Sequence, residues 1–533
     1  MDELGTISPS LEEFRDLART HRVIPVRTTV LADAMTPIGL YRTLVLRPDG
    51  TAPSGTFLLE SAAQGIWSRW SWVGVSSRAT LTSDDGEATW IGEPPVGLPT
   101  AGSPVEALRT TMDVLHTSRF NDAPPLTSGM VGFVGWEAVR HWEKLPNPPR
   151  DDLGIPELAM NLVADMAVHD SQNGTVTLVA NAINADGTDE RVDQAYQDAL
   201  DRVHDMLAKL SSSAGQVSVT KEEARGRDVV GAMSGGGSSP DMEFLVDQSW
   251  DREIFLDSIQ EAKQAIVDGE IFQVVISRRF ETALSAAPLD VYRALRRINP
   301  SPYMYLYSFE DAHGRDYQIV GSSPEALVTV TDREVVTHPI AGSRPRGATP
   351  AEDLVFEKDL LADDKERAEH LMLVDLSRND LSKVCVPGTV DVTEFMEVER
   401  FSHIMHLCSN VVGKMRDDTH AYDVLAATFP AGTLSGAPKP RALQLLDHYE
   451  PFRRAVYGGV VGYMDFAGDM DMAIAIRTAL LVDGKAYVQA GGGIVADSVP
   501  ESEATESLNK ATAPLRAALM AEQLRALGQG ERL

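Results

Sequence analysis

One stretch of this 533-residue sequence, residues 211–243, is unsuited to a folded core. It is rich in serine and glycine and includes the consecutive glycines 235–237. Few of its side chains could bury apolar surface to offset the entropy lost on ordering, so it is typical of a linker or a surface loop. We therefore predict an N-terminal domain over 1–210, a linker over 211–243, a larger domain over 244–525 and a tail over 526–533.

The hydrophobic pattern on both sides of this stretch predicts a mixture of helices and strands. Helices are expected over 10–19, 192–210, 251–267, 363–376, 421–428, 439–449 and from 501 onward. Strands are expected over 39–46, 55–59, 71–75, 129–134, 271–280, 304–309, 326–330, 334–339, 457–464, 472–481 and 485–490. Short turns such as Asp483-Gly484 favour antiparallel pairing of the late strands, so the predicted fold class is α+β with antiparallel-rich sheets.

The charge balance excludes several classes of partner. With 48 basic and 78 acidic residues, the formal net charge is −30. Such a chain lacks the basic surface that nucleic acids or anionic membranes require. The two cysteines, Cys385 and Cys408, are too few for a disulfide framework, and no run of 18 apolar residues occurs. We expect a cytoplasmic protein that binds neither nucleic acid nor membrane.

Two pairs of carboxylates share a helix face by their spacing. Glu366 and Glu369 are three residues apart, and Glu503, Glu506 and Lys510 follow the same periodicity near the C-terminus. Oxygen ligands from two helices suit Mg²⁺. On spacing alone, two solvated helix faces are the favoured interpretation, because acidic residues three apart on a helix are ordinary.

Other positions also have both a structural and a functional interpretation. The glycines 491–493 follow a predicted strand and would let backbone N–H groups approach an anion, or would simply form a flexible turn. Arg477 interrupts an apolar strand and would pair with a protein carboxylate or with a substrate. His406 is a candidate core histidine or site histidine. No GxSxG motif occurs, and neither cysteine has the context of a nucleophile.

Eight segments, in their order and spacing, resemble component I of anthranilate synthase, the large subunit, within the chorismate-utilising enzymes. The segments are GEIFQVVISRRF (269–280), GSSPEALV (321–328), PIAGSRPRG (339–347), DDKERAEHLMLVDLSRNDL (363–381), FPAGTLSGAPKPRA (429–442), YGGVVGY (457–463), AIAIRTAL (473–480) and QAGGGIVADSVPESEATESLNKA (489–511). The resemblance covers roughly residues 245–525, so chance agreement is negligible and a site interpretation of these residues gains support.

The resemblance implies a two-domain α+β fold with the active site in the C-terminal, chorismate-binding domain. The implied reaction joins chorismate and ammonia, releases anthranilate and pyruvate, and requires Mg²⁺. Ammonia would come from glutamine through a separate amidotransferase subunit (component II), in a heterotetramer of two large and two small subunits. The absence of an activated cysteine in this chain agrees with that division of labour.

The matched motifs imply a role for each candidate residue. Glu325 would be the general acid that protonates the departing ring hydroxyl, for which burial must raise its pKa. His406 would assist the second step, in which the ring proton and pyruvate leave. The implied catalytic residues are Glu325, His406, Lys510 and Gln273; the substrate-binding residues are Thr433, Tyr457, Arg477, Gly491, Gly492 and Gly493; and the Mg²⁺ ligands are Glu369 and Glu506, with Glu366 and Glu503 beside them.

Two positions discriminate among related enzymes. Isochorismate and salicylate synthases carry a water-activating lysine where this chain has Gln273, whose amide cannot act as a base. Aminodeoxychorismate synthases typically carry a nucleophilic lysine where this chain has Ala341. Both differences favour anthranilate formation, although another ammonia-using enzyme, such as an aminodeoxyisochorismate synthase, stays open. An inactive regulatory relative would have lost the metal carboxylates, which are intact.

A further resemblance concerns regulation by tryptophan. The segments LLES (58–61) and NPSPYM (299–304) are similar to the tryptophan-sensing elements of the same subunit. If they meet in space, one bound tryptophan would bridge the two domains and inhibit the enzyme. The alternative is that LLES is only a strand end. The candidate inhibitor-binding residues are Glu60, Ser61, Asn299, Pro300, Pro302, Tyr303, Met304 and Tyr463.

Overall fold

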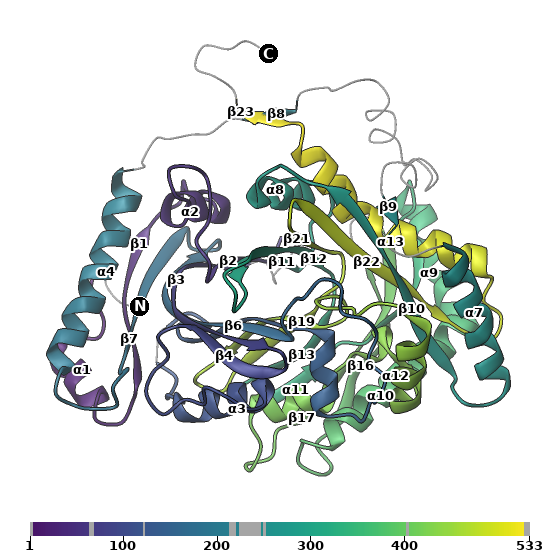
Figure 1. Ribbon diagram of the computed structural model, residues 1–533, viewed down its shortest axis with the longest axis horizontal. Coiled ribbons are helices and arrows are strands. Elements are labelled where there is room, and N and C mark those ends of the chain that lie inside the picture. The colour runs from purple at the N-terminus through teal and green to yellow at the C-terminus, as the bar shows by residue number, and fades with distance from the viewer. Residues whose placement is uncertain are drawn as a thin grey trace.

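The structure, a computed structural model, describes residues 4–62, 69–120, 123–212, 220–222, 247–248, 252–400 and 404–526. Strands fill the centre of the molecule and most helices lie on its outside (Figure 1). Of the predicted linker 211–243, residues 211–212 end a long helix and 220–222 form a short strand, and the rest lies outside the described residues. The division into domains stays a prediction.

The helices and strands have the following bounds. The α-helices are α1 (Leu11–Leu17), α2 (Pro37–Leu44), α3 (Pro104–Val114), α4 (Val192–Ser212), α7 (Arg252–Val267), α8 (Pro288–Ile298), α9 (Pro350–Ala362), α10 (Asp364–Ser382), α11 (Ala421–Thr428), α12 (Lys439–Tyr449) and α13 (Pro500–Ala521), and the 3₁₀ helices are η2 (Trp136–His141) and η3 (Gly432–Leu434). The strands are β1 (Val23–Leu31), β2 (Thr56–Glu60), β3 (Trp70–Asp84), β4 (Glu87–Gly92), β5 (Gly129–Val134), β6 (Leu158–Asp170), β7 (Thr175–Ile183), β8 (Thr220–Glu222), β9 (Asp247–Gln248), β10 (Gln273–Ala283), β11 (Tyr303–Glu310), β12 (Asp316–Ser323), β13 (Ala326–Thr331), β14 (Glu334–Thr337), β15 (Ile340–Pro345), β16 (Asp391–Arg400), β17 (Ile404–Lys414), β18 (Gly436–Ala437), β19 (Val460–Asp465), β20 (Met470–Ile474), β21 (Thr478–Val482), β22 (Lys485–Ile494) and β23 (Leu524–Ala526).

The strands join segments that lie far apart in the sequence. Apart from β8 and β23, the strands of the described residues form one connected, 21-stranded network. In it, β2 pairs antiparallel with β11, and β5 pairs antiparallel with β19. The N-terminal and C-terminal parts of the chain therefore share a hydrogen-bonded sheet. The antiparallel pairing and the segregated helices confirm the predicted α+β class.

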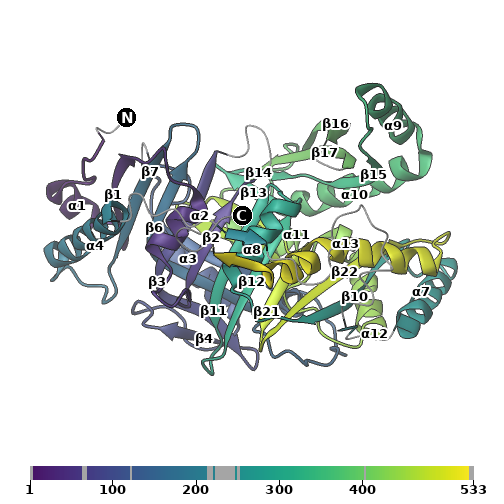
Figure 2. The same ribbon diagram turned by 90° about the horizontal axis from the view of Figure 1, so that it is seen from above.

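Two long helices position the site described below. α13 packs along β22 and against α8, while α10 packs on β15 and β17 (Figures 1 and 2). Seen from above, α10 with β15–β17 and α13 with β22 belong to the half of the molecule away from α1 and α4 (Figure 2). Their facing sides supply residues from sequence-distant motifs to a common cavity.

Two expected strands differ from the structure. The segment predicted as a strand over 39–46 is mostly helix α2, because Thr36 caps it by accepting a hydrogen bond from the Gly39 N–H at 3.0 Å and Pro37 occupies its first turn. Leu40 and Leu44, four residues apart, are buried together. The strand predicted over 472–481 is divided into β20 and β21 by a break that contains Arg477.

A buried ion pair ties several of these elements together. The Arg454 and Glu450 side chains are 1% and 4% exposed and lie 2.7 Å apart. Glu450 also accepts hydrogen bonds from the N–H and hydroxyl of Ser277 at 2.9 and 2.7 Å, and Arg454 donates to the Leu434 carbonyl oxygen at 2.7 Å. The guanidinium carbon lies 4.1 Å from the ring centroid of Trp136 in η2. Because few of these polar groups reach water, their pairing is required for stability.

Replacing Arg454 with methionine is expected to lower the free energy of unfolding by roughly 3–4 kcal/mol, because it leaves Glu450 charged and buried without a cation. Urea denaturation followed by circular dichroism would measure the loss. Arg453→Met is the matched control, since its ion pair with Asp151 at 3.2 Å is partly exposed and is worth about 1 kcal/mol or less. Equal losses for the two variants would contradict this interpretation.

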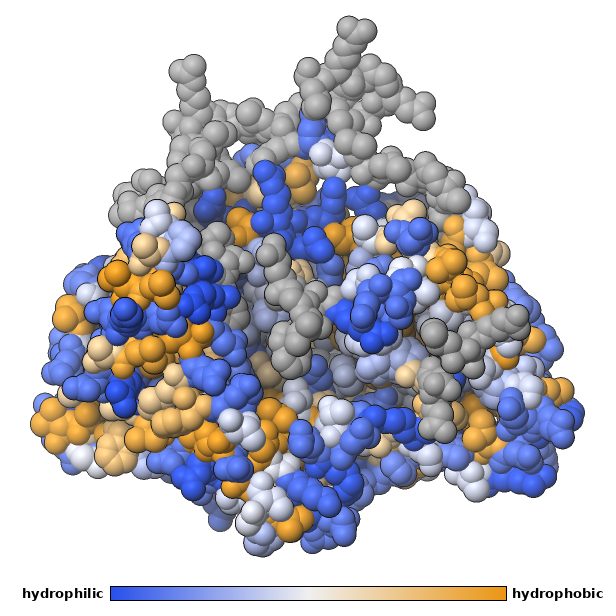
Figure 3. Space-filling model, turned by 180° about the vertical axis from the view of Figure 1, so that it is seen from behind, coloured by the Kyte–Doolittle hydropathy of each residue, from blue (hydrophilic) through white to orange (hydrophobic). Residues whose placement is uncertain are grey.

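The surface shows hydrophilic and hydrophobic residues interspersed on the face seen from behind (Figure 3). Within the described ranges, none of the helices combines the length and apolar character needed to cross a membrane.

Candidate active site

A cavity of about 370 Å³ collects most of the residues predicted to act on the substrate. It lies between α10, α13, η3 and the strands β10, β15, β17 and β22. Its lining includes Gln273, Glu325, Glu369, His406, Thr433, Tyr457, Arg477, Gly491, Gly493, Glu506 and Lys510. Of the predicted set, Gly492 is the one that does not line it, although it lies between two glycines that do.

Glu325 lies between β12 and β13 with its carboxyl group facing this cavity. Its Oε1 accepts a hydrogen bond from the Thr433 hydroxyl at 3.3 Å. Burial raises the pKa of Glu325 to about 7, an effect that Thr433 and the nearby cations of His338, Arg477 and Lys510 moderate. A carboxyl group with this pKa is partly protonated near neutrality, as a general acid must be.

His406, on β17, is held in one tautomer. Its Nδ1 lies 2.8 Å from the Gly342 carbonyl oxygen, which can only accept, so Nδ1 carries the hydrogen. Burial lowers the pKa of His406, so the ring is neutral near pH 7 and Nε2 is its basic nitrogen. The geometry thus supplies a base to the same cavity as the acid Glu325.

Arg477 is not part of a strand, contrary to the expectation from the sequence. It lies between β20 and β21 with a φ of +52°, a left-handed conformation that is uncommon for an arginine. Within the described part of the chain, no carboxylate lies within ion-pair distance of its guanidinium group. Tyr457, which is 8% exposed, lines the cavity with it. An arginine held in this way is available for a planar carboxylate of a ligand.

The three glycines lie inside β22, not in the turn expected after it. A Cβ atom at Gly491 would lie 2.2 Å from the Ile276 carbonyl oxygen on the paired strand β10. At Gly493 it would lie 2.3 Å from the Gln273 amide nitrogen, and at Gly492 it would lie 2.8 Å from a Glu503 carboxylate oxygen. The glycines therefore allow close strand pairing and leave space for the polar side chains of the cavity.

The carboxylates of α10 and α13 carry negative charge that the protein only partly neutralises. Lys510 lies 2.7 Å from Glu506, and the Gln273 amide donates to Glu369 at 3.2 Å. Glu369 and Glu503 have no ion pair within the described ranges. Burial, followed by repulsion from Glu369, raises the pKa of Glu366. Hard oxygen donors with uncompensated charge fit a divalent cation such as Mg²⁺.

The cavity therefore combines the groups needed for acid–base chemistry on an anion. It has an acid in Glu325, a base in His406, an arginine for a carboxylate and a set of carboxylates that suits a cation. Ala341 and Gln273 also line it. A lysine at position 341 would indicate a lysine nucleophile, and a lysine at position 273 would indicate activation of water.

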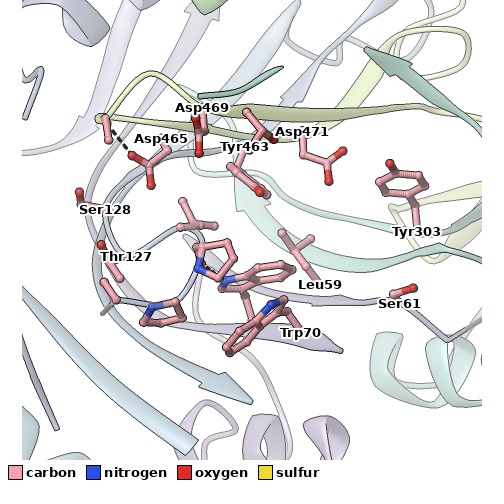
Figure 4. A pocket seen from close by; sticks show the side chains of 18 of the residues that line it. Leu59, Ser61, Trp70, Thr127, Ser128, Tyr303, Tyr463, Asp465, Asp469 and Asp471 are labelled. Carbon is pink, nitrogen blue, oxygen red and sulfur yellow. Dashed lines mark hydrogen bonds between the residues drawn. The ribbon is translucent and has the colours of Figure 1, made fainter. Parts of the chain in front are cut away.

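A second cavity, of about 460 Å³, lies between β2, β3, β11, β19 and β20 (Figure 4). It brings together Glu60, Ser61, Pro302, Tyr303, Met304 and Tyr463 from the predicted tryptophan-sensing set. Asn299 and Pro300 do not line it, and the Asn299 amide instead donates to the Ser322 hydroxyl at 3.0 Å. The β2–β11 pairing places Glu60 opposite Met304, which explains how the two segments meet.

Not every predicted sensing residue offers free polar atoms to this second cavity. The Glu60 carboxylate accepts two hydrogen bonds from Arg296 and one from the Tyr292 hydroxyl, each at 2.7 Å. The buried Ser61 hydroxyl, in contrast, has no hydrogen-bond partner among the described residues. Glu60 thus has a structural role in holding α8 against β2, and Ser61 is available to a ligand.

Several residues of the second cavity were not predicted from the sequence. Trp70 and Leu59 lie on a side of the cavity opposite Asp465, Asp469 and Asp471 (Figure 4), and Trp72 also lines it. Burial raises the pKa of Asp471 to about 6, and its buried Oδ1 has no hydrogen-bond partner within the described ranges. The acidic segment GDMD (468–471), at the start of β20, was a visible signal for Asp469 and Asp471. The tryptophans carried none, since isolated aromatic residues in strands are ordinary.

Comparison with known proteins gives a consistent result. A family model described as chorismate binding enzyme matches residues 54–516. The chain is 64% identical over 519 residues to anthranilate synthase component 1 of Arthrobacter globiformis, covering 97% of this chain and 94% of the relative. It is 50% identical over 527 residues to that of Mycobacterium tuberculosis H37Rv, covering 97% of each.

Solved structures show the same likeness. Anthranilate synthase component I from Streptococcus pneumoniae TIGR4 is 31% identical, with a TM-score of 0.70 over 91% of this chain and 99% of that one. The menaquinone-specific isochorismate synthase from Escherichia coli is 18% identical, with a TM-score of 0.66 over 96% and 98% of the two chains. At this identity the second likeness concerns the fold alone.

Proposed function

The chain belongs to the anthranilate synthase component 1 family of chorismate-binding enzymes, and we propose that it converts chorismate and ammonia to anthranilate and pyruvate. The observation that carries this proposal is the placement of Glu325, His406 and Arg477 in one cavity whose other lining residues include the carboxylates of α10 and α13. The family gives the reaction class, and the cavity supplies a residue for each step.

In the first step, ammonia attacks ring carbon 2 of chorismate while the hydroxyl group at carbon 4 departs. Glu325 gives its proton to the departing oxygen, which leaves as water. Arg477 and Tyr457 orient the substrate through its enolpyruvyl carboxylate, and the backbone of Gly491 and Gly493 borders the same cavity.

In the second step, His406 removes the proton from ring carbon 2 through its basic Nε2. The enolpyruvyl ether bond then breaks, the ring becomes aromatic, and the released fragment takes up a proton to become pyruvate. The hydrogen bond from Nδ1 to the Gly342 carbonyl keeps the ring in the tautomer that this transfer requires.

Glu369 and Glu506 would hold the Mg²⁺, with Glu366 and Glu503 next to them on the same helix faces. When bound, the ion would polarise the ring carboxylate of the substrate as a Lewis acid. Lys510 adds a positive charge beside Glu506. These carboxylates suit Mg²⁺ because they are oxygen donors whose negative charge the protein only partly neutralises.

The ammonia would be supplied by a glutamine amidotransferase subunit, component II, as the naming of the relatives as component 1 suggests. The two cysteines of this chain do not offer an alternative nucleophile for releasing ammonia from glutamine, since both are buried. Burial also raises the pKa of the Cys385 thiol. We propose a cytoplasmic heterotetramer of two large and two small subunits.

An assay with ammonium salt tests the proposal without the partner. The purified chain, chorismate, Mg²⁺ and ammonium at mildly alkaline pH should give rising anthranilate fluorescence, and glutamine in place of ammonium should give none. A ring product that retains the enolpyruvyl group would instead support the runner-up, an aminodeoxychorismate or aminodeoxyisochorismate synthase. The alanine at 341 and the glutamine at 273 argue against lysine-dependent relatives.

We also propose that the second cavity binds tryptophan as a feedback inhibitor. Its apolar side with Trp70 and Trp72 suits an indole ring, and the buried Asp471 suits an ammonium group. The segment 471–477 supports coupling, because Asp471 and Ala473 line this cavity while Arg477 lines the active site. A ligand that shifts β20 would therefore move Arg477.

Replacing Ser61 with leucine is expected to weaken tryptophan inhibition at least about tenfold, because the larger side chain fills part of the cavity and the substitution removes a hydroxyl group available to the ligand. Ammonia-dependent turnover without tryptophan should stay within about twofold of the wild type, since Ser61 is outside the active site. Inhibition curves with and without tryptophan measure both effects. Ser83→Leu, in β3 but outside the cavity lining, is a control, and unchanged inhibition of Ser61→Leu would remove Ser61 from the site.

A further inference from the structure

Glu325 faces two cavities. Besides the active site, it lines a smaller cavity of about 50 Å³ together with Leu327, Thr337 and His338. Apart from Glu325 and Thr433, this smaller cavity contains none of the residues assigned to substrate or metal. Its volume suits a few water molecules rather than a substrate. The proposed acid therefore borders a second, small cavity that His338 lines and that is too small for the substrate.

The contacts of His338 favour its charged, imidazolium form. Its Nδ1 lies 2.5 Å from the Asn410 side-chain oxygen, and its Nε2 lies 3.3 Å from a Glu399 carboxylate oxygen. The Asn410 amide nitrogen donates to Glu394, so the amide oxygen is the atom that faces His338. Both ring nitrogens thus face acceptors, an arrangement that the doubly protonated, charged ring satisfies.

The electrostatic surroundings agree with this assignment. Burial lowers the pKa of His338, but the hydrogen bonds to Glu399 and Asn410 outweigh it and leave the pKa raised. His370, on the neighbouring helix α10, contacts the Ser409 hydroxyl through its Nε2 at 2.6 Å. Asp380 also lines the small cavity but is paired with Lys383 and Lys439 at 2.8 and 3.1 Å.

The other cations near Glu325 are in a different position. Arg477 and Lys510 line the active-site cavity, where a dianionic substrate would pair with them. Binding of that substrate also brings two negative charges toward Glu325. Both effects strengthen the hold of Glu325 on its proton, and an acid that holds its proton too tightly transfers it slowly. His338 lies outside this cavity, so the substrate cannot neutralise it.

We propose that His338 is a positioning residue, a fixed cation behind Glu325 that determines the pH range over which this carboxyl group gives up its proton in the substrate complex. The proposal rests on the role proposed above for Glu325. It assigns a function to the His338–Glu399–Asn410 cluster, which the reaction steps do not otherwise use. The groups that face Glu325 and His338 from the elements packed around them are Asp380, His370, Glu399, His406, Cys408, Thr433, Arg477 and Lys510.

The test compares the pH dependence of kcat for the wild type and His338→Gln with ammonium and saturating chorismate. The ratio of the two rates at each pH removes the titration of ammonium itself. We expect the limb at which kcat falls with rising pH to move upward by roughly one pH unit in His338→Gln. The KM for chorismate should change less than about twofold, because His338 does not line the substrate cavity. His338→Lys, which restores a cation, should move the limb back toward the wild type.

His448→Gln is the matched control, because His448 forms an ion pair with Glu261 at the same 3.3 Å distance but on the exposed surface. A limb that stays in place in His338→Gln, or that moves equally in His448→Gln, would overturn the proposal. A second measurement does not depend on variants: ¹⁵N shifts of the His338 ring in the wild type should show both nitrogens protonated at pH 7, and a neutral ring would overturn it. Absence of anthranilate from the wild type would instead refute the proposed function.

Discussion

Replacing Glu325 with glutamine is expected to lower kcat of the ammonia-dependent reaction by about 10³-fold. The amide has nearly the shape of the protonated carboxyl group, and its oxygen can still accept the hydrogen bond from Thr433. It has no proton to give to the departing hydroxyl group near neutral pH. The KM for chorismate should therefore change little, while the chemical step slows. Steady-state kinetics by anthranilate fluorescence measure both constants.

The control for this experiment is Glu334→Gln, an exposed glutamate at the start of β14 that lines neither the active site nor the small cavity. It should retain the activity of the wild type. A Glu325→Gln variant that turns over within about tenfold of the wild type would assign the proton to another group. A rise in KM without a fall in kcat would make Glu325 a binding residue instead.

Replacing Glu506 with glutamine is expected to lower the turnover rate by at least about 10³-fold at a Mg²⁺ concentration that saturates the wild type. The change removes one anionic oxygen donor and releases Lys510 from its ion pair. The metal-binding constant, measured by calorimetry with Mg²⁺ alone, should weaken in parallel. Raising the Mg²⁺ concentration should recover part of the activity if lost affinity is the cause.

Glu501→Gln is the matched control on the same helix. Glu501 is exposed and pairs with Arg252 at the surface, away from the lining of the cavity. It should bind Mg²⁺ and turn over as the wild type does. A fully active Glu506→Gln variant would refute the metal-binding role of Glu506.

Local patterns in the sequence predicted much of the fold and of the active site. The three-residue spacing of Glu366 and Glu369 placed them on one face of α10, because residues three apart in a regular helix lie on the same side of it. The segment around Gly39 was misjudged because its short apolar run suits a strand or a helix equally, and the cap at Thr36 decided in favour of a helix. The break at Arg477 depends on a backbone conformation that the apolar pattern does not reveal.

The second cavity shows the limit of reasoning along the chain. Its lining combines Trp70 of β3, Tyr303 of β11 and Asp471 of β20. The first two meet because β2 pairs with both β3 and β11, while β20 is joined to the sheet through β19, which pairs with β5. Register between distant strands depends on the whole core, so neither Trp70 nor Asp471 could be assigned from its own segment. His338 was missed for the same reason, since its partners Glu399 and Asn410 lie on β16 and β17.

The most direct test of the central claim is to quantify both products formed from chorismate by the purified chain with Mg²⁺ and ¹⁵N-ammonium. Nuclear magnetic resonance of the reaction mixture should show anthranilate and pyruvate appearing together in equal amounts, with the ¹⁵N label in the anthranilate amino group. Formation of an amino compound that retains the enolpyruvyl group, of isochorismate, or of no product would contradict the assignment of this chain as a catalyst of anthranilate formation.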